Sequence, residues 1–340
     1  MRIQRLLLPV GLFLLSIPLL PSAMLCRPVR GAEWKPLTTE LLASEKPGYG
    51  GLCGVTVERE SGDLYLNVSD KGIYRSQDRG KTWKRLGDGF KGRTETPGCM
   101  AFDPTGKTKR LLTALVYGGP INMTPDLGQT WQSMDKGTTH VDWAAIDWTA
   151  AEPKFVLALK HESGGVLLAS HDGGKSFSEI GKGYGPAWIF DENTAVVAEA
   201  KSKDKPMPTL VRTTDGGKTF SASGEYNCRA LPQWNAGILY WLTDNAIITT
   251  SDKGQSWKKV CDVKNGLYGP VFGRDAKQMF LVTNAGVIES TDAGATWSAP
   301  LAVPKEMKGV SQMTWLDYDP KNDVLYTVKM SSDLFALERK

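Results

Sequence analysis

Six copies of one eight-residue motif constrain the fold of this chain more than any other feature. The motif reads Ser/Thr-X-Asp-X-Gly-X-Ser/Thr-aromatic, and its copies are SQDRGKTW (76–83), TPDLGQTW (124–131), SHDGGKSF (170–177), TTDGGKTF (213–220), TSDKGQSW (250–257) and STDAGATW (290–297). Successive aspartates lie 48, 46, 43, 37 and 40 residues apart. Near-constant spacing of this length indicates a repeat architecture in which each repeat is one supersecondary unit.

Each position of the motif favours a tight turn. The aspartate carboxylate can accept hydrogen bonds from amides further along the turn, and the glycine two residues later permits a left-handed backbone. Short β-type runs, such as GIYRS (72–76) and AIITT (246–250), precede the copies, and the closing aromatic restarts a strand. Each copy therefore predicts a hairpin tip between two strands.

The motif resembles the Asp box, also called the BNR repeat, of sialidase-like β-propellers. The same repeat occurs in sortilin-type receptors, xyloglucanase-like glycoside hydrolases and photosystem II assembly-factor propellers. The resemblance covers Ser76 to Trp297 directly. It implies that each box joins the third and fourth strands of a blade, away from the ligand face, so the six aspartates have structural roles.

The number of blades follows from the two ends of the chain. Three strands without a box are expected after residue 310, and EWKPL (33–37) matches the sequence that follows the first box, TWKRL (82–86). We therefore predict an all-β, seven-bladed β-propeller of four-stranded blades, with the last blade closed by the N-terminal strand. The 308 residues from 33 to 340 then give 44 per blade, in line with the roughly 40–50 residues of a four-stranded blade.

The first 32 residues predict a secretory signal peptide. Arg2 and Arg5 precede a 15-residue apolar run, Leu6 to Leu20, which is too short to span a bilayer, and small residues for cleavage follow at Ala23 and Ala32. Cleavage after Ala32 removes four arginines from the net charge of +4 and leaves 37 basic and 37 acidic residues. We expect a secreted or periplasmic monomer, residues 33–340 as a single domain, no remaining membrane span and no nucleic-acid partner.

The resemblance implies a ligand face made by two sets of loops, those leading into each innermost strand and those between second and third strands. A His/carboxylate group falls there: His140, Asp142, His161 and Glu162. The two histidines are expected to be cross-strand neighbours. Such a group can carry out acid–base catalysis or bind a divalent metal, or it can be a polar rim without a ligand. His171 lies in a box and is expected to be solvated.

Aromatic and basic residues gather on the same loops. Aromatic faces can hold the apolar side of a polar ligand, and guanidinium or ammonium groups can meet an anion. In the alternative, several of the rings plug the central channel and the cations are surface charges. The candidates are Tyr49, Tyr117, Trp143, Tyr184, Trp188, Tyr226, Trp234, Tyr268 and Trp315, with Arg93, Lys160 and Arg229.

A sialidase site is not indicated. Sialidases resembling this scaffold place three arginines around the substrate carboxylate, the first usually in an Arg-Ile-Pro motif, and neither Arg-Ile-Pro nor Arg-Leu-Pro occurs in this chain. A glycosidase with two carboxylates about 5–9.5 Å apart remains open. Its candidates are Glu95, Asp142, Glu162 and Glu199.

Four cysteines remain after processing: Cys53, Cys99, Cys228 and Cys261. They allow three pairings, of which Cys53–Cys99 with Cys228–Cys261 is favoured because the first two begin innermost strands of adjacent blades. Unpaired thiols are the alternative. No CxxC motif supports a zinc or redox site.

The sequence thus predicts a secreted binding module for a glycan or a protein, without cofactor or metal. The alternatives are a carbohydrate-active hydrolase or lyase that uses the His140–Glu162 group, and an exported assembly factor.

Overall fold

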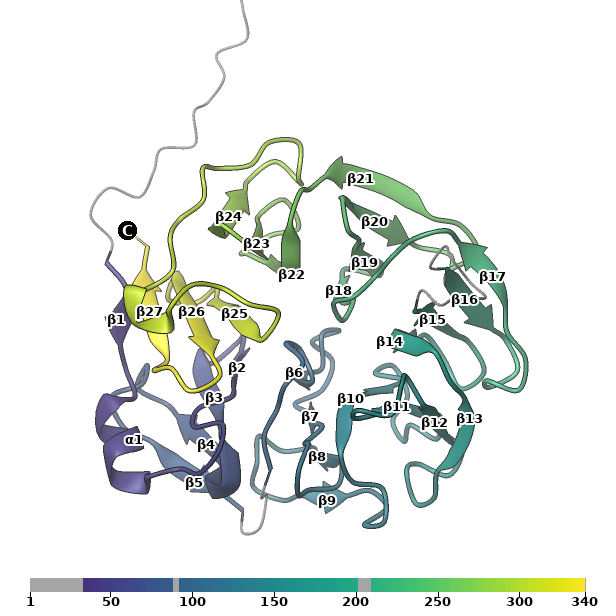
Figure 1. Ribbon diagram of the computed structural model, residues 1–340, viewed down its shortest axis with the longest axis horizontal. Helices are drawn as coiled ribbons and strands as arrows, with labels where there is room; N and C mark the ends of the chain where they lie inside the picture. Colours follow the sequence, from purple (N-terminus) through teal and green to yellow (C-terminus); the bar gives the residue numbers. More distant parts are fainter. Residues whose placement is uncertain (1–32, 88–91, 201–208, 340) are drawn as a thin grey trace, which may run out of the picture.

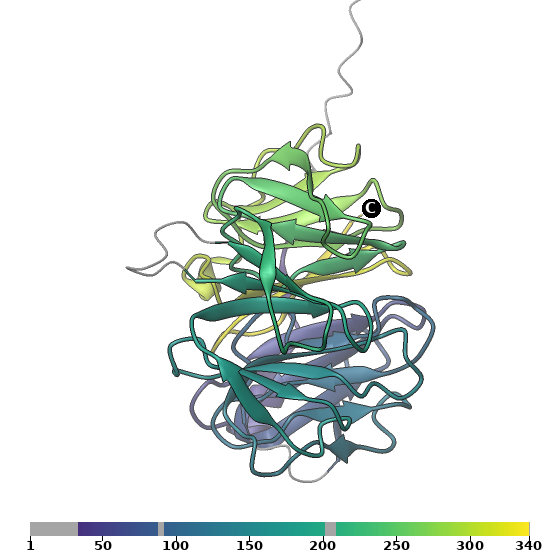
Figure 2. The ribbon, with the colours of Figure 1, turned by 90° about the vertical axis from the view of Figure 1, so that its right-hand side faces the viewer.

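The structure is a computed structural model that describes residues 33–87, 92–200 and 209–339. Within these residues, seven antiparallel sheets surround a central axis like the blades of a propeller (Figure 1). Six sheets have four strands and one has three. From the side, the twisted sheets are seen to stack around the ring (Figure 2). The predicted seven-bladed, all-β fold is confirmed, while the predicted signal peptide lies outside the described residues.

The first four blades follow one another along the chain, each running from its innermost to its outermost strand. Blade 1 has β2 (Gly54–Glu58), β3 (Asp63–Val68), β4 (Gly72–Ser76) and β5 (Lys84–Leu86). Blade 2 has β6 (Met100–Phe102), β7 (Leu111–Thr113), β8 (Asn122–Thr124) and β9 (Gln132–Ser133). Blade 3 has β10 (Val141–Ile146), β11 (Val156–Lys160), β12 (Leu167–Ser170) and β13 (Ser178–Gly181). Blade 4 has β14 (Tyr184–Ile189), β15 (Ala195–Glu199), β16 (Leu210–Thr213) and β17 (Ser221–Gly224).

The last three blades complete the ring. Blade 5 has β18 (Gln233–Asn235), β19 (Ile238–Leu242), β20 (Ala246–Thr250) and β21 (Lys258–Asp262). Blade 6 has β22 (Gly266–Phe272), β23 (Met279–Thr283) and β24 (Gly286–Ser290). Blade 7 has β25 (Thr314–Asp319), β26 (Val324–Lys329), β27 (Phe335–Glu338) and, outermost, β1 (Lys35–Pro36).

Blade 7 closes the ring with both ends of the chain, as predicted. Lys35 pairs with Ala336 and Pro36 with Phe335, both antiparallel. Immediately after β1, the buried Thr38 hydroxyl donates to Asp333 Oδ1 at 2.9 Å and accepts from the Leu334 amide at 2.9 Å. The N-terminal strand is thus fastened to the blade by backbone and side-chain hydrogen bonds.

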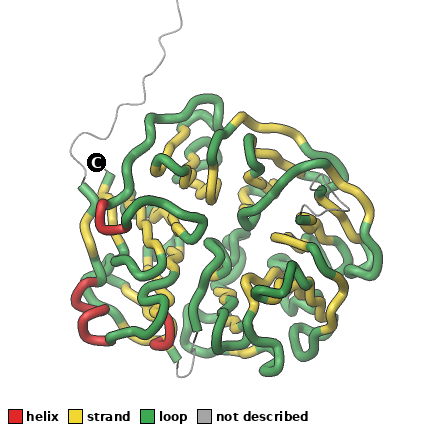
Figure 3. The backbone as a smooth tube through the Cα atoms, viewed as in Figure 1, coloured by secondary structure: helices red, strands yellow, loops and turns green. Residues whose placement is uncertain are grey.

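Short helices occur where only loops were expected. Helix α1 (Thr39–Glu45) joins β1 to β2 on the outside of the ring, and single 3₁₀ turns η1 (Ser69–Lys71) and η2 (Lys305–Met307) lie in loops (Figure 3). The sequence of α1, TELLASE, consists largely of strong helix formers. Leu41 and Leu42 pack against the core.

The six boxes join the third and fourth strands, or in blade 6 follow the third. In the first, Asp78 Oδ1 accepts from the amides of Lys81 and Thr82 at 3.1 and 2.9 Å, and the Thr82 hydroxyl donates to Oδ2 at 2.6 Å. The Ser76 hydroxyl accepts from the Gly80 amide at 2.7 Å. These are the turn bonds expected from the motif.

Each box also contacts the preceding blade. A Cβ built on Gly128 would lie 2.6 Å from Leu86 of β5, one on Gly217 would lie 3.2 Å from Ile180 of β13, and one on Gly254 would lie 2.3 Å from Val196 of β15. The Ser223 hydroxyl of β17 donates to the Gly254 carbonyl at 2.6 Å. The boxes therefore fasten adjacent blades together as well as turning the chain.

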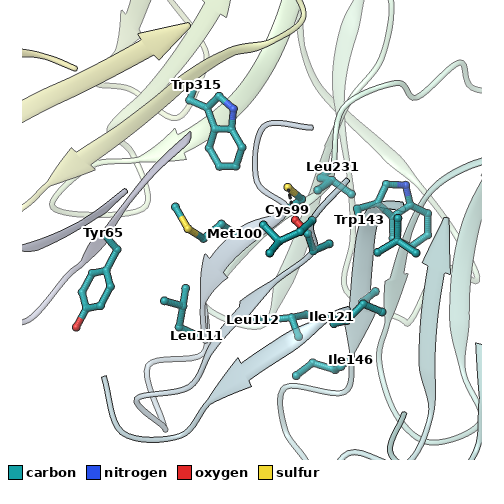
Figure 4. Close-up of a cluster of buried hydrophobic side chains, with 14 of the residues drawn as sticks. Tyr65, Cys99, Met100, Leu111, Leu112, Ile121, Trp143, Ile146, Leu231 and Trp315 are labelled. Carbon is teal, nitrogen blue, oxygen red and sulfur yellow. Dashed lines mark hydrogen bonds between the residues drawn. The ribbon is translucent and has the colours of Figure 1, made fainter. Parts of the chain in front are cut away.

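The core lies between blades and around the axis. Buried side chains from neighbouring blades meet in the cluster of Figure 4, in which Met100, Leu111 and Leu112 of blade 2 lie between Tyr65 of blade 1 and Trp143 and Ile146 of blade 3. Burial of such side chains is the main stabilising contribution to a fold of this kind.

The predicted disulfides are not present. Cys53, Cys99, Cys228 and Cys261 are all free thiols, which is the alternative that the sequence left open. Cys53 and Cys99 do precede innermost strands of adjacent blades, but their thiols turn to local carbonyls: Cys53 Sγ donates to Gly50 O at 3.3 Å and Cys99 Sγ to Ala114 O at 3.7 Å. Burial raises the pKa of the Cys53 thiol to about 12, so it is protonated at neutral pH.

Candidate functional site

Loops of three consecutive blades meet on one side of the ring. We call the following residues the loop-face cluster: Tyr49 before β2, Arg93 and Glu95 before β6, Tyr117 between β7 and β8, Asp142 at the start of β10, and His161 and Glu162 between β11 and β12. These loops belong to the two sets expected to form the ligand face. The antiparallel order of each blade brings both sets to the same face.

Arg93 lies at the centre of the cluster between two tyrosines. Its guanidinium carbon is 4.2 Å from the Tyr49 ring centre and 4.5 Å from that of Tyr117, both within cation–π range. Arg93 Nε donates to Glu95 Oε1 at 2.6 Å, and Nη2 donates to the same oxygen. Arg93 itself is buried, whereas Tyr49 is 76% exposed and Tyr117 is 46% exposed. The stack thus holds two exposed rings in fixed positions.

His161 connects this stack to Asp142. Its Nδ1 lies 2.6 Å from Asp142 Oδ1 and its Nε2 lies 3.1 Å from the Tyr117 hydroxyl. In one tautomer of the ring, Nδ1–H donates to Asp142 and Nε2 accepts from the Tyr117 hydroxyl. Burial raises the pKa of Asp142, opposed by the hydrogen bond from His161. Desolvation and the nearby Glu162 raise the pKa of Tyr117, which favours the phenol over the phenolate.

His140 positions the cluster rather than joining it. The His161 amide donates to the His140 carbonyl at 2.7 Å, so the two histidines are cross-strand neighbours as predicted. His140 Nδ1 accepts from the Tyr117 amide at 3.2 Å. Both imidazoles pack edge-to-face with the Tyr117 ring. The centre of this ring lies 5.3 Å from that of His140 and 5.0 Å from that of His161.

The backbone beneath the cluster is held in an uncommon conformation. Tyr117, His140 and Glu162 have φ angles of 55°, 57° and 49°, in the left-handed region that non-glycine residues seldom occupy. Each such residue costs on the order of 1 kcal/mol and persists only where its surroundings fix it. Three of them side by side indicate a rigid, preorganised surface.

Three side chains of the cluster can supply metal ligands. Glu95, Asp142 and His161 each offer one ligand atom, and these atoms lie within 4.8 Å of one another. One imidazole and two carboxylates suit a divalent cation. In this structure, however, His161 Nδ1 is paired with Asp142, and Arg93 is paired with Glu95. A cation would displace the imidazole proton and meet the Arg93 charge nearby.

The remaining predicted ligand residues lie elsewhere. Trp143 and Tyr268 are only 1% and 7% exposed, so they cannot stack on a ligand at the loop face and do not belong to the candidate site. Both belong to innermost strands, and their aromatic side chains fill space in the interior of the propeller. Trp315, on the innermost strand of blade 7, is likewise buried.

Two aromatic candidates line the central channel instead. Trp188 stacks on Trp234, with ring centres 5.7 Å apart and planes within 8° of parallel. Tyr184, at the start of the innermost strand β14, packs against Phe220 of the fourth box, with ring centres 5.5 Å apart. Arg229 is exposed and lies 3.5 Å from Asp244 in blade 5, away from the cluster. His171 is exposed as expected, and its ring stacks on Phe155.

Comparisons with known proteins agree with the fold. The Sortilin-Vps10 family model, described as sortilin, neurotensin receptor 3, matches residues 71–231. A structure described as YCF48 bound to D1 peptide is 14% identical, with 91% of this chain and 95% of that chain covered and a TM-score of 0.54. No curated protein gives a significant match.

Two further solved structures share the architecture. The β-propeller domain of Cps50 (Swd1) from Myceliophteria thermophila is 11% identical over 86% of this chain and 97% of that chain, with a TM-score of 0.58. The extracellular domain of the one-component system BT4673 from B. thetaiotaomicron is 8% identical over 90% of this chain and 40% of that chain, with a TM-score of 0.55. At these identities, the similarity concerns the fold alone. Among the described residues, no helix has the length and apolarity needed to cross a bilayer.

Proposed function

We propose that this chain, a β-propeller with six Asp-box motifs whose residues 71–231 match the Sortilin-Vps10 model, is a binding module whose loop face takes a basic segment of a partner protein. The observation that carries this proposal is the Tyr49–Arg93–Tyr117 stack, which presents two exposed rings beside three carboxylates. Tyrosine and arginine are the residues that most often supply binding energy at protein interfaces.

The charge of the cluster selects the partner. Glu95, Asp142 and Glu162 carry three carboxylates against the single guanidinium of Arg93. Glu162 is exposed, with its Oε1 3.6 Å from His161 Nε2, and Arg93 is paired with Glu95, so the exposed charge of the cluster is negative. A lysine or arginine of the partner can pair with Glu162 and lay its alkyl chain along Tyr117.

Rigidity supports a role in binding. The stacked rings have few rotamers to lose, and the left-handed backbone under Tyr117 and Glu162 already holds the loops in place. Preorganisation of this kind lowers the entropic cost of association. YCF48, which has a similar fold over its whole length, is described as bound to a peptide. We further propose that the partner lies outside the cytoplasm, in line with the signal peptide predicted from the sequence, and an exported assembly factor would be one form of this function.

The test is a binding measurement on purified protein against an array of peptides that differ in charge. We expect the tightest peptides to be basic. Tyr117→Ala should weaken their binding by about 10-fold or more, as for an interface residue that contributes over 1.4 kcal/mol. Val260→Ala, an exposed apolar side chain on β21, is the matched control and should change nothing.

A second pair of variants tests the charge. The side chains of Glu162 and Asp262 are 73% and 76% exposed, so Glu162→Gln and Asp262→Asn remove comparable surface charges. Only Glu162→Gln should weaken the binding of basic peptides. The difference in affinity between the two variants should shrink at high salt. Acidic peptides binding best, or a glycan array giving the only ligands, would refute the proposal.

A second candidate function, a carbohydrate-active hydrolase or lyase, is favoured by the hydrogen-bonded series Asp142–His161–Tyr117. In such an enzyme the imidazole would move a proton to or from the Tyr117 hydroxyl. The raised pKa of Tyr117 works against a phenolate base. Turnover of a polysaccharide by the wild type that is lost in both His161→Ala and Glu162→Ala would support the enzyme over the binding module.

A further inference from the structure

The central channel of the ring is closed at the loop face. A Cβ on Gly98, just before β6, would lie 3.3 Å from the Tyr268 hydroxyl of blade 6 and 3.5 Å from Leu231 of blade 5. Between the adjacent blades 1 and 7, a Cβ on Gly54 of β2 would lie 2.9 Å from the Trp315 ring of β25. The Tyr268 and Leu231 side chains of blades 6 and 5 therefore approach Gly98 of blade 2 across the axis and separate the channel from the loop-face cluster.

Beneath this closure lies a cavity of about 500 Å³ that is lined by all seven innermost strands. It continues to the turns that leave these strands, on the opposite face of the ring. Glu60, Gly106, Ala236, Arg274 and Asp275 of these turns belong to its lining and are exposed. The cavity is thus a socket with one closed end and a mouth on the turn face.

Aromatic and small residues shape the socket. The stacked pair Trp188 and Trp234 forms part of its wall, and Phe102 and Phe272 lie on the lining as well. Ala144 and Ala187, from β10 and β14, leave room where larger residues would fill the channel. Natural ligand sites are concave, have volumes of about 300–1,000 Å³ and have mostly apolar and aromatic walls.

The basic groups on the lining are already engaged with the protein. Arg59 donates to the carbonyls of Phe272 and Gly273 at 3.0 and 2.6 Å, reaching from blade 1 to blade 6. Lys109 is paired with Glu58 and Glu60 at 2.9 and 2.5 Å. An anionic ligand would have to break one of these contacts to find a counter-charge.

The carboxylates on the lining are engaged in the same way. Asp317 Oδ2 accepts from the Val57 amide at 2.8 Å and Oδ1 from the Tyr318 amide at 2.8 Å. Asp103 accepts from the hydroxyls of Thr105 and Thr108, each at 2.6 Å. The inner wall therefore offers aromatic faces, the side-chain amide of Asn235, and that of Gln233, whose Nε2 makes a long 3.4 Å hydrogen bond to the Leu231 carbonyl.

From this geometry, we propose that the central channel is a second binding site, distinct from the loop-face cluster, for a small neutral molecule with a flat apolar ring system. Its ring would stack beside Trp188, and a hydroxyl or carbonyl would meet an amide of Gln233 or Asn235. A dry cavity of about 150 Å³ accommodates benzene. A socket roughly three times as large suits two or three fused rings.

The test compares two ligands that share one ring system, 2-naphthol, which is neutral at pH 7, and 2-naphthalenesulfonate, which is anionic. Each is titrated into the purified protein by isothermal calorimetry. We expect saturable binding of one 2-naphthol per chain, at least 10-fold tighter than that of the sulfonate. Ala144→Phe places a phenyl ring in the cavity and should weaken the binding of 2-naphthol by at least 10-fold.

Two further variants complete the test. Trp188→Ala should also weaken 2-naphthol, whereas Tyr117→Ala on the loop face should leave it unchanged. Ala144→Phe should bind the basic peptides of the loop face like the wild type, so the two sites can fail separately. Absence of saturable binding, equal affinity for the sulfonate, or an unchanged affinity in a folded Ala144→Phe would overturn the proposal.

Discussion

The glycine two residues after the aspartate of each box has a backbone conformation that other residue types seldom adopt. The φ angles are 86° at Gly80, 88° at Gly128, 81° at Gly174, 86° at Gly217, 77° at Gly254 and 90° at Gly294. A side chain there would also meet the preceding blade. Glycine is therefore required for two reasons: the turn needs a positive φ, and the preceding blade leaves no space for a side chain.

A pair of substitutions separates these two reasons. Gly254 and Gly237 have similar φ angles, 77° and 87°, but a Cβ at Gly254 would lie 2.3 Å from Val196 while one at Gly237 has nothing within 4 Å. We expect Gly237→Ala to cost about 1–2 kcal/mol from the backbone alone. Gly254→Ala should cost about 1–3 kcal/mol more from overpacking.

Urea unfolding of both variants measures the difference in the free energy of unfolding. Equal losses would show that the box glycine is required only for its turn conformation, and that contact between blades at this position is unimportant.

At this scale, the sequence identified candidates but not their arrangement. His140, Asp142 and His161 could be placed together because one hairpin carries all three. The position of Arg93 between Tyr49 and Tyr117 depends on loops of different blades, which no local pattern specifies. The same holds for Trp143 and Tyr268, whose burial is set by the width of the ring.

At the scale of elements, ring closure depends on a two-residue strand. β1 is held by its pairing with β27 and by Thr38, whose hydroxyl both donates to Asp333 and accepts from the Leu334 amide. Thr38→Val removes both bonds and leaves the buried amide without this acceptor. We expect a loss of about 1–3 kcal/mol in the free energy of unfolding.

Thr39 provides the matched control. Its exposed hydroxyl donates to the same Asp333 oxygen at 3.2 Å, so Thr39→Val should be close to neutral. If Thr38→Val were equally neutral, the closure of blade 7 would not rest on this residue.

The strand order could be predicted because turn chemistry is local and repeats. Each box fixes two strands, and the Asp103–Gly106 turn separates β6 from β7 as expected. Helix α1 was missed because the repeat has no counterpart for it. Blade 6 has three strands: after its box, Pro300 lacks an amide hydrogen for a ladder, and the backbone of the segment bonds to β24 at the Val287–Leu301 bridge and through the Ser298 amide, which donates to the Glu289 carbonyl at 2.8 Å.

At the scale of the whole molecule, the repeated aspartates couple stability to pH. Hydrogen bonds from turn hydroxyls and amides lower the pKa of Asp78, Asp215 and Asp252 to about 2. Their stabilising effect is fully present above the unfolded pKa of about 3.9 and is lost as the pH falls toward 2. We expect the melting temperature to fall steeply only below pH ~4.

The variant Asp252→Asn tests this assignment. It should melt below the wild type at pH 7, and the gap should narrow between pH 4 and pH 2, because the wild type then loses the same charge. Calorimetric scans across this range provide the measurement. A gap that stays constant down to pH 2 would show that the box carboxylates are not the titrating groups.

The whole ring also explains why its two faces can differ in function. The loop face carries the strained, polar cluster, while the channel is closed to it by Tyr268 and Leu231, which pack against Gly98, and opens at the turns. The charge balance of residues 33–340 is even, so any attraction for a partner arises from local groups such as Glu162 and not from the molecule as a whole.

The location of the bound partner segment tests the central claim most directly. Amide hydrogen exchange should be measured with and without the tightest-binding peptide. The account predicts slower exchange in the loops of blades 1 to 3 on the loop face, around Tyr49, Arg93, Tyr117 and His161. Protection confined to the box turns or the outer strands, with these loops unchanged, would contradict it.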